Sequence, residues 1–142
     1  MIGAQIEEGR GKRTGRRVLA TQPSIKVEAS AEETMTLLGV EGTSIITYTA
    51  SIKHDGSIDG EGEGIFVSQG ATVTWKGIGV GRLQENGSIL YTGSLSFNTT
   101  SEKLAKLNQI SGVFEWEIDA QGNTHSKMWE FVAASASRST TA

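Results

Sequence analysis

Apolar and polar residues alternate along most of this chain, which is the pattern of β-strands that bury one face. Between residues 43 and 53, for example, Ile46, Tyr48 and Ala50 share one face, and threonines lie mainly on the other. Glycine-containing turn signals separate the alternating runs, and Asn-Gly and Asp-Gly are typical of tight hairpins. These signals are H-D-G at 54–56, S-Q-G at 68–70, E-N-G at 85–87 and A-Q-G at 120–122.

The alternation and the turns together predict an all-β protein. We expect strands over 2–6, 16–21, 25–30, 34–40, 43–53, 57–68, 71–83, 88–98, 111–119 and 123–132. In this interpretation G-R-G-K-R-T-G at 9–15 breaks the first strand signal, and E-G at 41–42 separates two strands. A short helical turn is expected near residues 101–108, because Leu104, Leu107 and Ile110 recur at helical spacing.

Strands that follow one another in hairpins favour a single antiparallel up-and-down β-barrel of about eight strands, because closure removes exposed sheet edges. An open β-sandwich is the alternative, and it would leave two edges exposed. We expect the barrel domain to span residues 1–132. Residues 133–142 contain no large apolar side chain, so we expect them to form a disordered C-terminal tail.

Glycines at every second position support closure of the sheet. Two such rows occur, Gly60, Gly62 and Gly64 in one strand and Gly77, Gly79 and Gly81 in the next. Alternate residues of a strand share a face, so each row leaves one face without side chains. Rows of this kind mark tight bends or close backbone approach. We therefore predict structural, not catalytic, roles for Gly62, Gly79 and Gly93.

Composition excludes several kinds of chemistry. The chain has 142 residues and no cysteine, so disulfides and cysteine-ligated zinc are excluded. Its two histidines, His54 and His125, have no metal-ligand spacing, and we expect neither a metal nor a cofactor. We find no signal peptide and no apolar run of membrane-spanning length, and we expect a cytoplasmic protein without a membrane partner.

Basic residues are concentrated in one segment of a chain whose net charge is −3. Five of them lie within residues 10–17, next to an acidic remainder and without interleaved aromatic residues. We expect no nucleic-acid partner, and we expect this segment to settle against the protein's own acidic side chains. The acidic partners expected for it are Glu61, Glu63, Glu115 and Glu117.

Rows of aromatic side chains on alternate positions are the candidate binding surface. The candidate ligand-binding residues are Trp75, Tyr91, Phe97, Phe114, Trp116, His125 and Trp129. Such rows line either a packed core, where aromatic side chains are common, or a pocket for a small hydrophobic molecule. In the second case Tyr91 and His125 would be the polar contacts. The acidic pairs at 61/63 and 115/117 have a spacing compatible with acid–base catalysis, but acidic alternation is more typical of a solvent-facing side. The pattern identifies no catalytic residue.

Several segments resemble small bacterial proteins of unassigned function. They are E-E-G-R-G-K-R-T-G-R-R-V-L at 7–19, G-E-G-I-F-V at 62–67, T-W-K-G-I-G-V-G-R at 74–82, K-L-A-K-L-N at 103–108 and F-E-W-E-I-D-A-Q-G-N-T-H-S-K-M-W-E-F at 114–131. More loosely, the chain resembles the allene-oxide-cyclase-like and calycin-like barrels. This looser resemblance implies a barrel with an apolar cavity and a tendency to oligomerise.

Two functional hypotheses follow. The first is a barrel that binds a small hydrophobic molecule, as a carrier or as a non-covalent cyclase or isomerase, within a homo-oligomer that is most simply a dimer. The second is a structural or interaction protein with a filled barrel that forms a homodimer through its apolar outer face. A cavity of about 300 Å³ or more would favour the first, and a packed interior the second.

Overall fold

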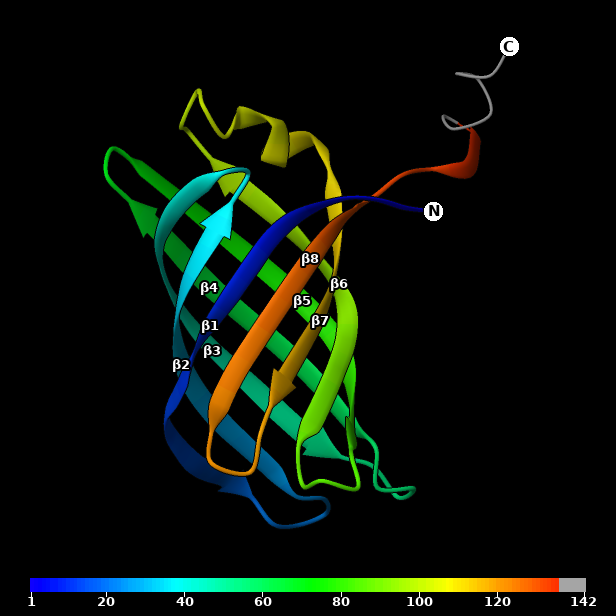
Figure 1. Cartoon of the computed structure of the whole chain (residues 1–142). Coiled ribbons are helices and arrows are strands. Elements are labelled where there is room, and N and C mark those ends of the chain that lie inside the picture. Colours follow the sequence, from blue (N-terminus) through cyan, green and yellow to red (C-terminus); the bar gives the residue numbers. More distant parts are fainter. Residues whose placement is uncertain (136–142) are drawn as a thin grey trace.

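Eight antiparallel strands form one closed barrel in chain order, and β1 pairs with β8 to complete the ring (Figure 1). The computed structural model describes residues 1–135. Its strands are β1 (Ile2–Ala20), β2 (Lys26–Leu37), β3 (Val40–Ile52), β4 (Ile58–Ser68), β5 (Ala71–Leu83), β6 (Ile89–Thr99), β7 (Ser111–Ile118) and β8 (Asn123–Phe131). The predicted all-β up-and-down barrel is confirmed. Residues 136–142, most of the predicted tail, lie outside the described residues.

A short 3-10 helix, η1 (Ala105–Gln109), connects β6 to β7 and is the predicted helical turn. Leu104 and Leu107 from this connection are fully buried in a cluster that includes Phe66 and Phe97. The connection therefore closes one end of the barrel, the upper end in Figure 1. Within residues 1–135, no helix is long and apolar enough to cross a membrane.

The predicted break of the first strand at residues 9–15 was wrong, because β1 continues through it. Gly9 pairs with Met35 of β2 on one side and with Ser126 of β8 on the other. A shift in register between Arg13 and Gly15 absorbs the irregularity as a bulge. The glycines are tolerated because the strand is held on both sides.

The predicted turn at 41–42 was also misplaced. The chain reverses at Leu38 and Gly39, whose φ angles are 47° and 80°. Both values lie in the left-handed region, which two-residue hairpin turns of this kind require. Glu41 and Gly42 instead pair with β2 in a regular ladder.

The glycine rows of β4 and β5 face the barrel interior. Along β4, exposed Glu61 and Glu63 alternate with half-buried glycines, and the row ends at the fully buried Phe66. Aromatic rings lie over the space that the glycines leave, since a Cβ at Gly64 would meet the ring of Trp75. The rows therefore make room for large side chains inside a narrow barrel.

The basic segment of β1 has other partners than those predicted. Arg17 Nε lies 3.0 Å from Glu28 Oε1 of the neighbouring strand β2. Glu63 lies next to Lys76, with 3.4 Å between its Oε1 and the lysine Nζ. The prediction of partners in β4 and β7 was wrong, because the neighbours of β1 in the barrel are β2 and β8.

Candidate functional site in the barrel interior

A cavity of about 60 Å³ lies among the interior side chains. Its lining is mainly apolar and aromatic, with Glu33 and Ser126 adding polar side chains. The other lining side chains include Met35, Ile46, Tyr48, Trp75, Tyr91, Leu95, Phe114, Trp116 and Met128, and glycines of β4 and β5 contribute bare backbone. This volume accommodates a few water molecules or a small chemical group. It is well below the size that the sequence argument set for a ligand pocket.

Two carboxyl groups are buried on the inner wall, and each residue is only 2% exposed. Glu33 belongs to the regular inward alternation of β2, between Ala31 and Met35. Glu7 lies in phase with Gly9 and Gly11 on the inner face of β1, and the shift in pairing with β8 between Gln5 and Glu7 allows the preceding residue, Ile6, to be buried as well. A bulge of this kind redirects a side chain, and bulges are common beside active sites.

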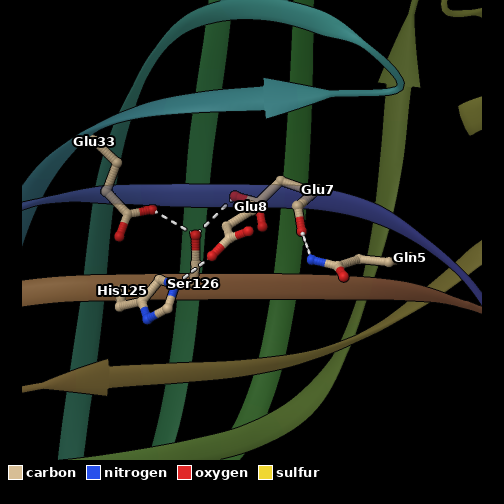
Figure 2. Close-up of polar contacts among 6 residues, drawn as sticks. All are labelled: Gln5, Glu7, Glu8, Glu33, His125 and Ser126. Atoms are coloured by element: carbon tan, nitrogen blue, oxygen red, sulfur yellow. Dashed lines mark hydrogen bonds and ion pairs between the residues drawn. The ribbon is translucent and has the colours of Figure 1, made fainter.

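The hydroxyl of Ser126 lies between the two carboxyl groups (Figure 2). Its Oγ is 2.7 Å from Glu7 Oε2 and 2.9 Å from Glu33 Oε1. Glu33 Oε2 accepts two further hydrogen bonds, from Thr124 Oγ1 at 2.7 Å and from Trp116 Nε1 at 3.0 Å. These five residues, Glu7, Glu33, Trp116, Thr124 and Ser126, form what we call the carboxyl cluster.

Counting hydrogens assigns the donors within this cluster. A serine hydroxyl has one hydrogen, so Ser126 can donate to only one carboxyl group. The other carboxyl must therefore carry a proton and donate it to Ser126 Oγ. Glu33 already accepts from Trp116 and Thr124, which is the arrangement of an ionised carboxylate. Glu7 is thus the protonated partner. It donates its hydrogen to Ser126 Oγ, and the Ser126 hydroxyl donates to Glu33.

The surroundings of Glu7 agree with this assignment. Burial raises the pKa of Glu7 to about 8, the carboxyl of Glu33 adds to the rise, and the Ser126 hydroxyl opposes it. The second oxygen, Glu7 Oε1, is buried without a hydrogen-bond partner among residues 1–135. An ionised carboxylate would be costly in such a place, whereas a neutral acid is tolerated.

We expect the stability of the folded protein to fall as pH rises from about 5 to about 8. The ordinary pKa of this group is 4.5 and its folded value is about 8, so between these values the folded state binds a proton that the unfolded state releases. The stabilisation is complete below the unfolded pKa and is lost as pH rises through the folded pKa, by up to about 1.4 kcal/mol per pH unit. Urea unfolding of Glu7→Gln at each pH should show a much flatter profile, because this variant cannot titrate there.

The matched control is Glu8→Gln, which changes the next residue of β1 on the outer face. The pKa of Glu8 is lowered by its hydrogen bond with His125, so its contribution has the opposite sign. The control should keep the fall in stability between pH 5 and pH 8. An equally steep fall in Glu7→Gln and in the parent protein would contradict the assignment of the proton to Glu7.

Three aromatic rings line the cavity: Trp116, which belongs to the carboxyl cluster, and the neighbouring Tyr48 and Tyr91. The ring centroids of Tyr48 and Trp116 are 4.9 Å apart, and Tyr91 lies 6.0 Å from each of them. Burial raises the pKa of both tyrosines, and for Tyr48 the nearby Arg13 guanidinium partly offsets the rise. Because Trp116 also donates to Glu33, the ring group and the carboxyl cluster form one continuous wall.

Of the seven candidate residues from the sequence, five belong to the barrel interior and two do not line the cavity. Trp75, Tyr91, Phe114 and Trp116 line the cavity, and Phe97 is buried in the cluster at the η1 end. The other two candidates, His125 and Trp129, are not among the cavity-lining residues.

The prediction that the His125 row of β8 faces inward was wrong. The buried residues of β8 are Thr124, Ser126 and Met128, so His125 and Trp129 belong to the opposite face. His125 Nε2 lies 2.7 Å from the exposed Glu8 (Figure 2). Thr124 and Ser126 of β8 can be buried although they are polar, because the carboxyl groups of Glu7 and Glu33 are their hydrogen-bond partners.

The fold and this interior define a class: a closed eight-stranded barrel with a narrow cavity and a buried carboxyl cluster. A protein of unknown function from Clostridium acetobutylicum has the same fold, with a TM-score of 0.80 and 10% identity over 93% of this chain and 100% of that chain. A conserved protein of unknown function from Rhodopseudomonas palustris matches with a TM-score of 0.77 and 12% identity, over 90% of this chain and 95% of that chain.

A third structure with this fold is an enzyme from Penicillium herquei, with a TM-score of 0.64 and 14% identity over 89% of this chain and 92% of that chain. No protein-family model and no curated protein matches the sequence. At these identities the similarities show the fold alone. At that level they confirm the resemblance to uncharacterised bacterial β-barrel proteins.

Proposed function

We propose that the barrel binds a small, mainly apolar molecule between the aromatic rings and the carboxyl cluster, and that Glu33 exchanges a proton with it. The reaction class is an isomerisation or a non-covalent cyclisation. One observation carries this proposal: the buried carboxyl group of Glu33 borders an aromatic-lined cavity, and the hydroxyl of Ser126, which also lines the cavity, joins it to the second buried carboxyl group, that of Glu7.

The energetic cost of the cluster supports a functional role. Two carboxyl groups buried in a barrel wall lose their hydration, and apolar side chains of similar volume often stabilise a core as well or better. Glu7 keeps one buried oxygen without a partner among residues 1–135. Acids with strongly perturbed pKa values are common at catalytic sites, and Glu7, whose pKa is raised, is joined through Ser126 to the cavity-lining Glu33. A purely structural interior has no need of this arrangement.

The proton transfer can proceed without any co-reactant. A carboxylate has about four acceptor positions, and Glu33 uses three of them. A C–H or O–H bond of the bound molecule would break, its proton would pass to the free position on Glu33, and the same proton would then return to another atom of the molecule. The neutral acid at Glu7, linked through Ser126, can exchange a proton with Glu33 during this step.

Binding requires the interior to expand beyond its 60 Å³. The end opposite η1 is the favoured entrance, because the η1 connection buries Leu104 and Leu107 at the other end. At the end opposite η1, Tyr48 and Tyr91 pack in a second buried cluster with Ile58 and Ile118, so entry would require these two rings to rotate. The same barrel fold occurs in an enzyme from Penicillium herquei, so this fold can host catalysis.

Calorimetric titration with 1-octanol tests the proposal, since this molecule is neutral, narrow and apolar. We expect one site per chain and a negative heat-capacity change, which marks burial of apolar surface. Leu95→Phe, which fills the cavity, should abolish binding. Ile65→Phe adds similar volume on the exposed outer face and should bind like the parent protein. No binding to the parent of either 1-octanol or octanoate would overturn the proposal.

The alternative function is a filled barrel that pairs with a second copy. It is favoured by exposed apolar side chains on the outer face of β5, where Ile78 is 62% and Val80 is 39% exposed. Large exposed apolar patches often mark protein–protein contacts. Absence of octanol and octanoate binding, together with a dimer in sedimentation, would establish this alternative in place of the first.

A further inference from the structure

Arg13 is the basic residue of β1 that points toward the barrel interior. On this part of β1, Gly9, Gly11 and Arg13 are the less exposed positions, and Arg10 and Lys12 between them are exposed. Arg13 pairs with Ala31 of β2, two residues along from Glu33. The guanidinium therefore lies on the inner wall, toward the end of the barrel opposite η1.

The neighbours of Arg13 place it at the end of the barrel opposite η1, beside one residue of the cavity wall. Its backbone N–H donates to the carbonyl of Gly122 at 2.8 Å, in the β7–β8 turn. Its guanidinium is packed near Gly122 and lies close enough to act on the hydroxyl of Tyr48. Tyr48 itself lines the cavity. One side chain thus links the turn at the rim to the aromatic wall.

Arg13 has no carboxylate partner within 4.0 Å among residues 1–135. Its exposed neighbours Arg10 and Lys12 also have none in this range, but Arg13 is half-buried on the inner face of β1. A half-buried guanidinium with planar donors is well suited to a carboxylate or another oxyanion. The Tyr48 hydroxyl beside it can donate a second hydrogen bond. The two groups therefore lie together at the end of the barrel that we propose as the entrance.

We propose that the molecule bound in the barrel carries an anionic group, and that Arg13 and the Tyr48 hydroxyl hold this group at the cavity entrance. The apolar part then extends between the aromatic rings toward Glu33. The ligand class is an amphipathic acid with one charged end. This inference rests on the proposed function and adds the chemistry of the ligand to it.

Octanoate and 1-octanol form the matched pair of probes, because they differ at the charged end and share the chain length. The parent protein should bind octanoate more tightly than 1-octanol at pH 7 and low salt. Arg13→Gln should weaken octanoate binding by about ten- to hundredfold, the range for a hydrogen bond to a charged group. Its affinity for 1-octanol should stay within about twofold of the parent value.

Lys12→Gln is the matched control, since it removes the same charge from the exposed neighbour on β1. It should leave the affinities for both probes unchanged. Arg13→Met keeps the aliphatic stem and serves as a second variant if Arg13→Gln does not fold. Octanoate binding that is equal in the parent, Arg13→Gln and Arg13→Met would overturn this inference while leaving the proposed function intact. Failure of both probes to bind the parent would instead reject the proposed function.

Discussion

Replacing Gly93 with alanine should lower the free energy of unfolding by about 3 kcal/mol or more, at or beyond the upper end of overpacking effects. Gly93 of β6 lies directly opposite Gly79 of β5. A Cβ at Gly93 would overlap the carbonyl oxygen of Ile78 and the Cα of Gly79. Both are backbone atoms, which cannot rotate away as the end of a side chain can. Urea unfolding measures the loss directly.

Gly15→Ala is the control for this variant, because an added Cβ there meets no atom within 4 Å. Its stability should stay within about 0.5 kcal/mol of the parent, as is usual for open surface positions. Gly62→Ala should fall between the two, since its nearest neighbour would be Tyr48 Cβ at 3.1 Å. A Gly93→Ala protein with the unfolding midpoint of the parent would show that the two strands are not in such close contact.

The sequence was sufficient for the barrel because its signals are local. Period-two alternation and Gly-containing turns mark a strand wherever one face is buried. The errors arose where tertiary pairing overrides such signals. The glycine-rich part of β1 remains a strand because β2 and β8 hold it on both sides, and the turn at Leu38 carries a residue that rarely adopts a positive φ.

The site was harder to predict because its chemistry depends on non-local contacts. Glu33 did leave a signal, as a lone acid in the inward row Ala29, Ala31, Glu33, Met35 and Leu37. Glu7 left a weak signal, since it is in phase with Gly9 and Gly11, but the shift in pairing beside it buries both Ile6 and Glu7, which a strict alternation does not predict. In β8, hydrophobicity favoured the face with Trp129, whereas the buried carboxyl groups select the face with Ser126. That choice depends on residues more than 90 positions away in the sequence, as for the pair Ser126 and Glu33.

Glu33→Ala should destabilise the barrel by about 2–5 kcal/mol, because buried neutral donors lose the carboxylate that accepts their hydrogen bonds. The substitution leaves the donors of Trp116 and Thr124 without their acceptor, whereas the hydrogen of Ser126 can turn toward Glu7. Each buried donor that loses its partner costs about 1–3 kcal/mol, and water entering the vacated space recovers part of the sum. Thermal and urea unfolding at pH 6 give the change in free energy.

Glu33→Gln separates the acceptor role of this residue from its charge. Its amide oxygen can still accept from Trp116 and Thr124, so the loss of stability should be less than half of that in Glu33→Ala. The amide N–H₂ group would then donate to Ser126 Oγ, and the serine hydrogen would turn toward Glu7. Without the neighbouring carboxyl and with a new donor, the pKa of Glu7 should fall, because both changes favour its ionised form.

The pH profile of Glu33→Gln therefore decides whether the cluster is a connected proton path. In the parent protein, stability should decline as pH rises toward about 8, the folded pKa of Glu7. In Glu33→Gln the decline should begin at the same pH, near the unfolded pKa, but end at lower pH and be smaller in total, since the folded pKa moves toward its unfolded value. A profile identical to that of the parent would mean that Ser126 does not couple the two carboxyl groups. Equal destabilisation by Gln and Ala would show that the hydrogen bonds to Glu33 require its charge.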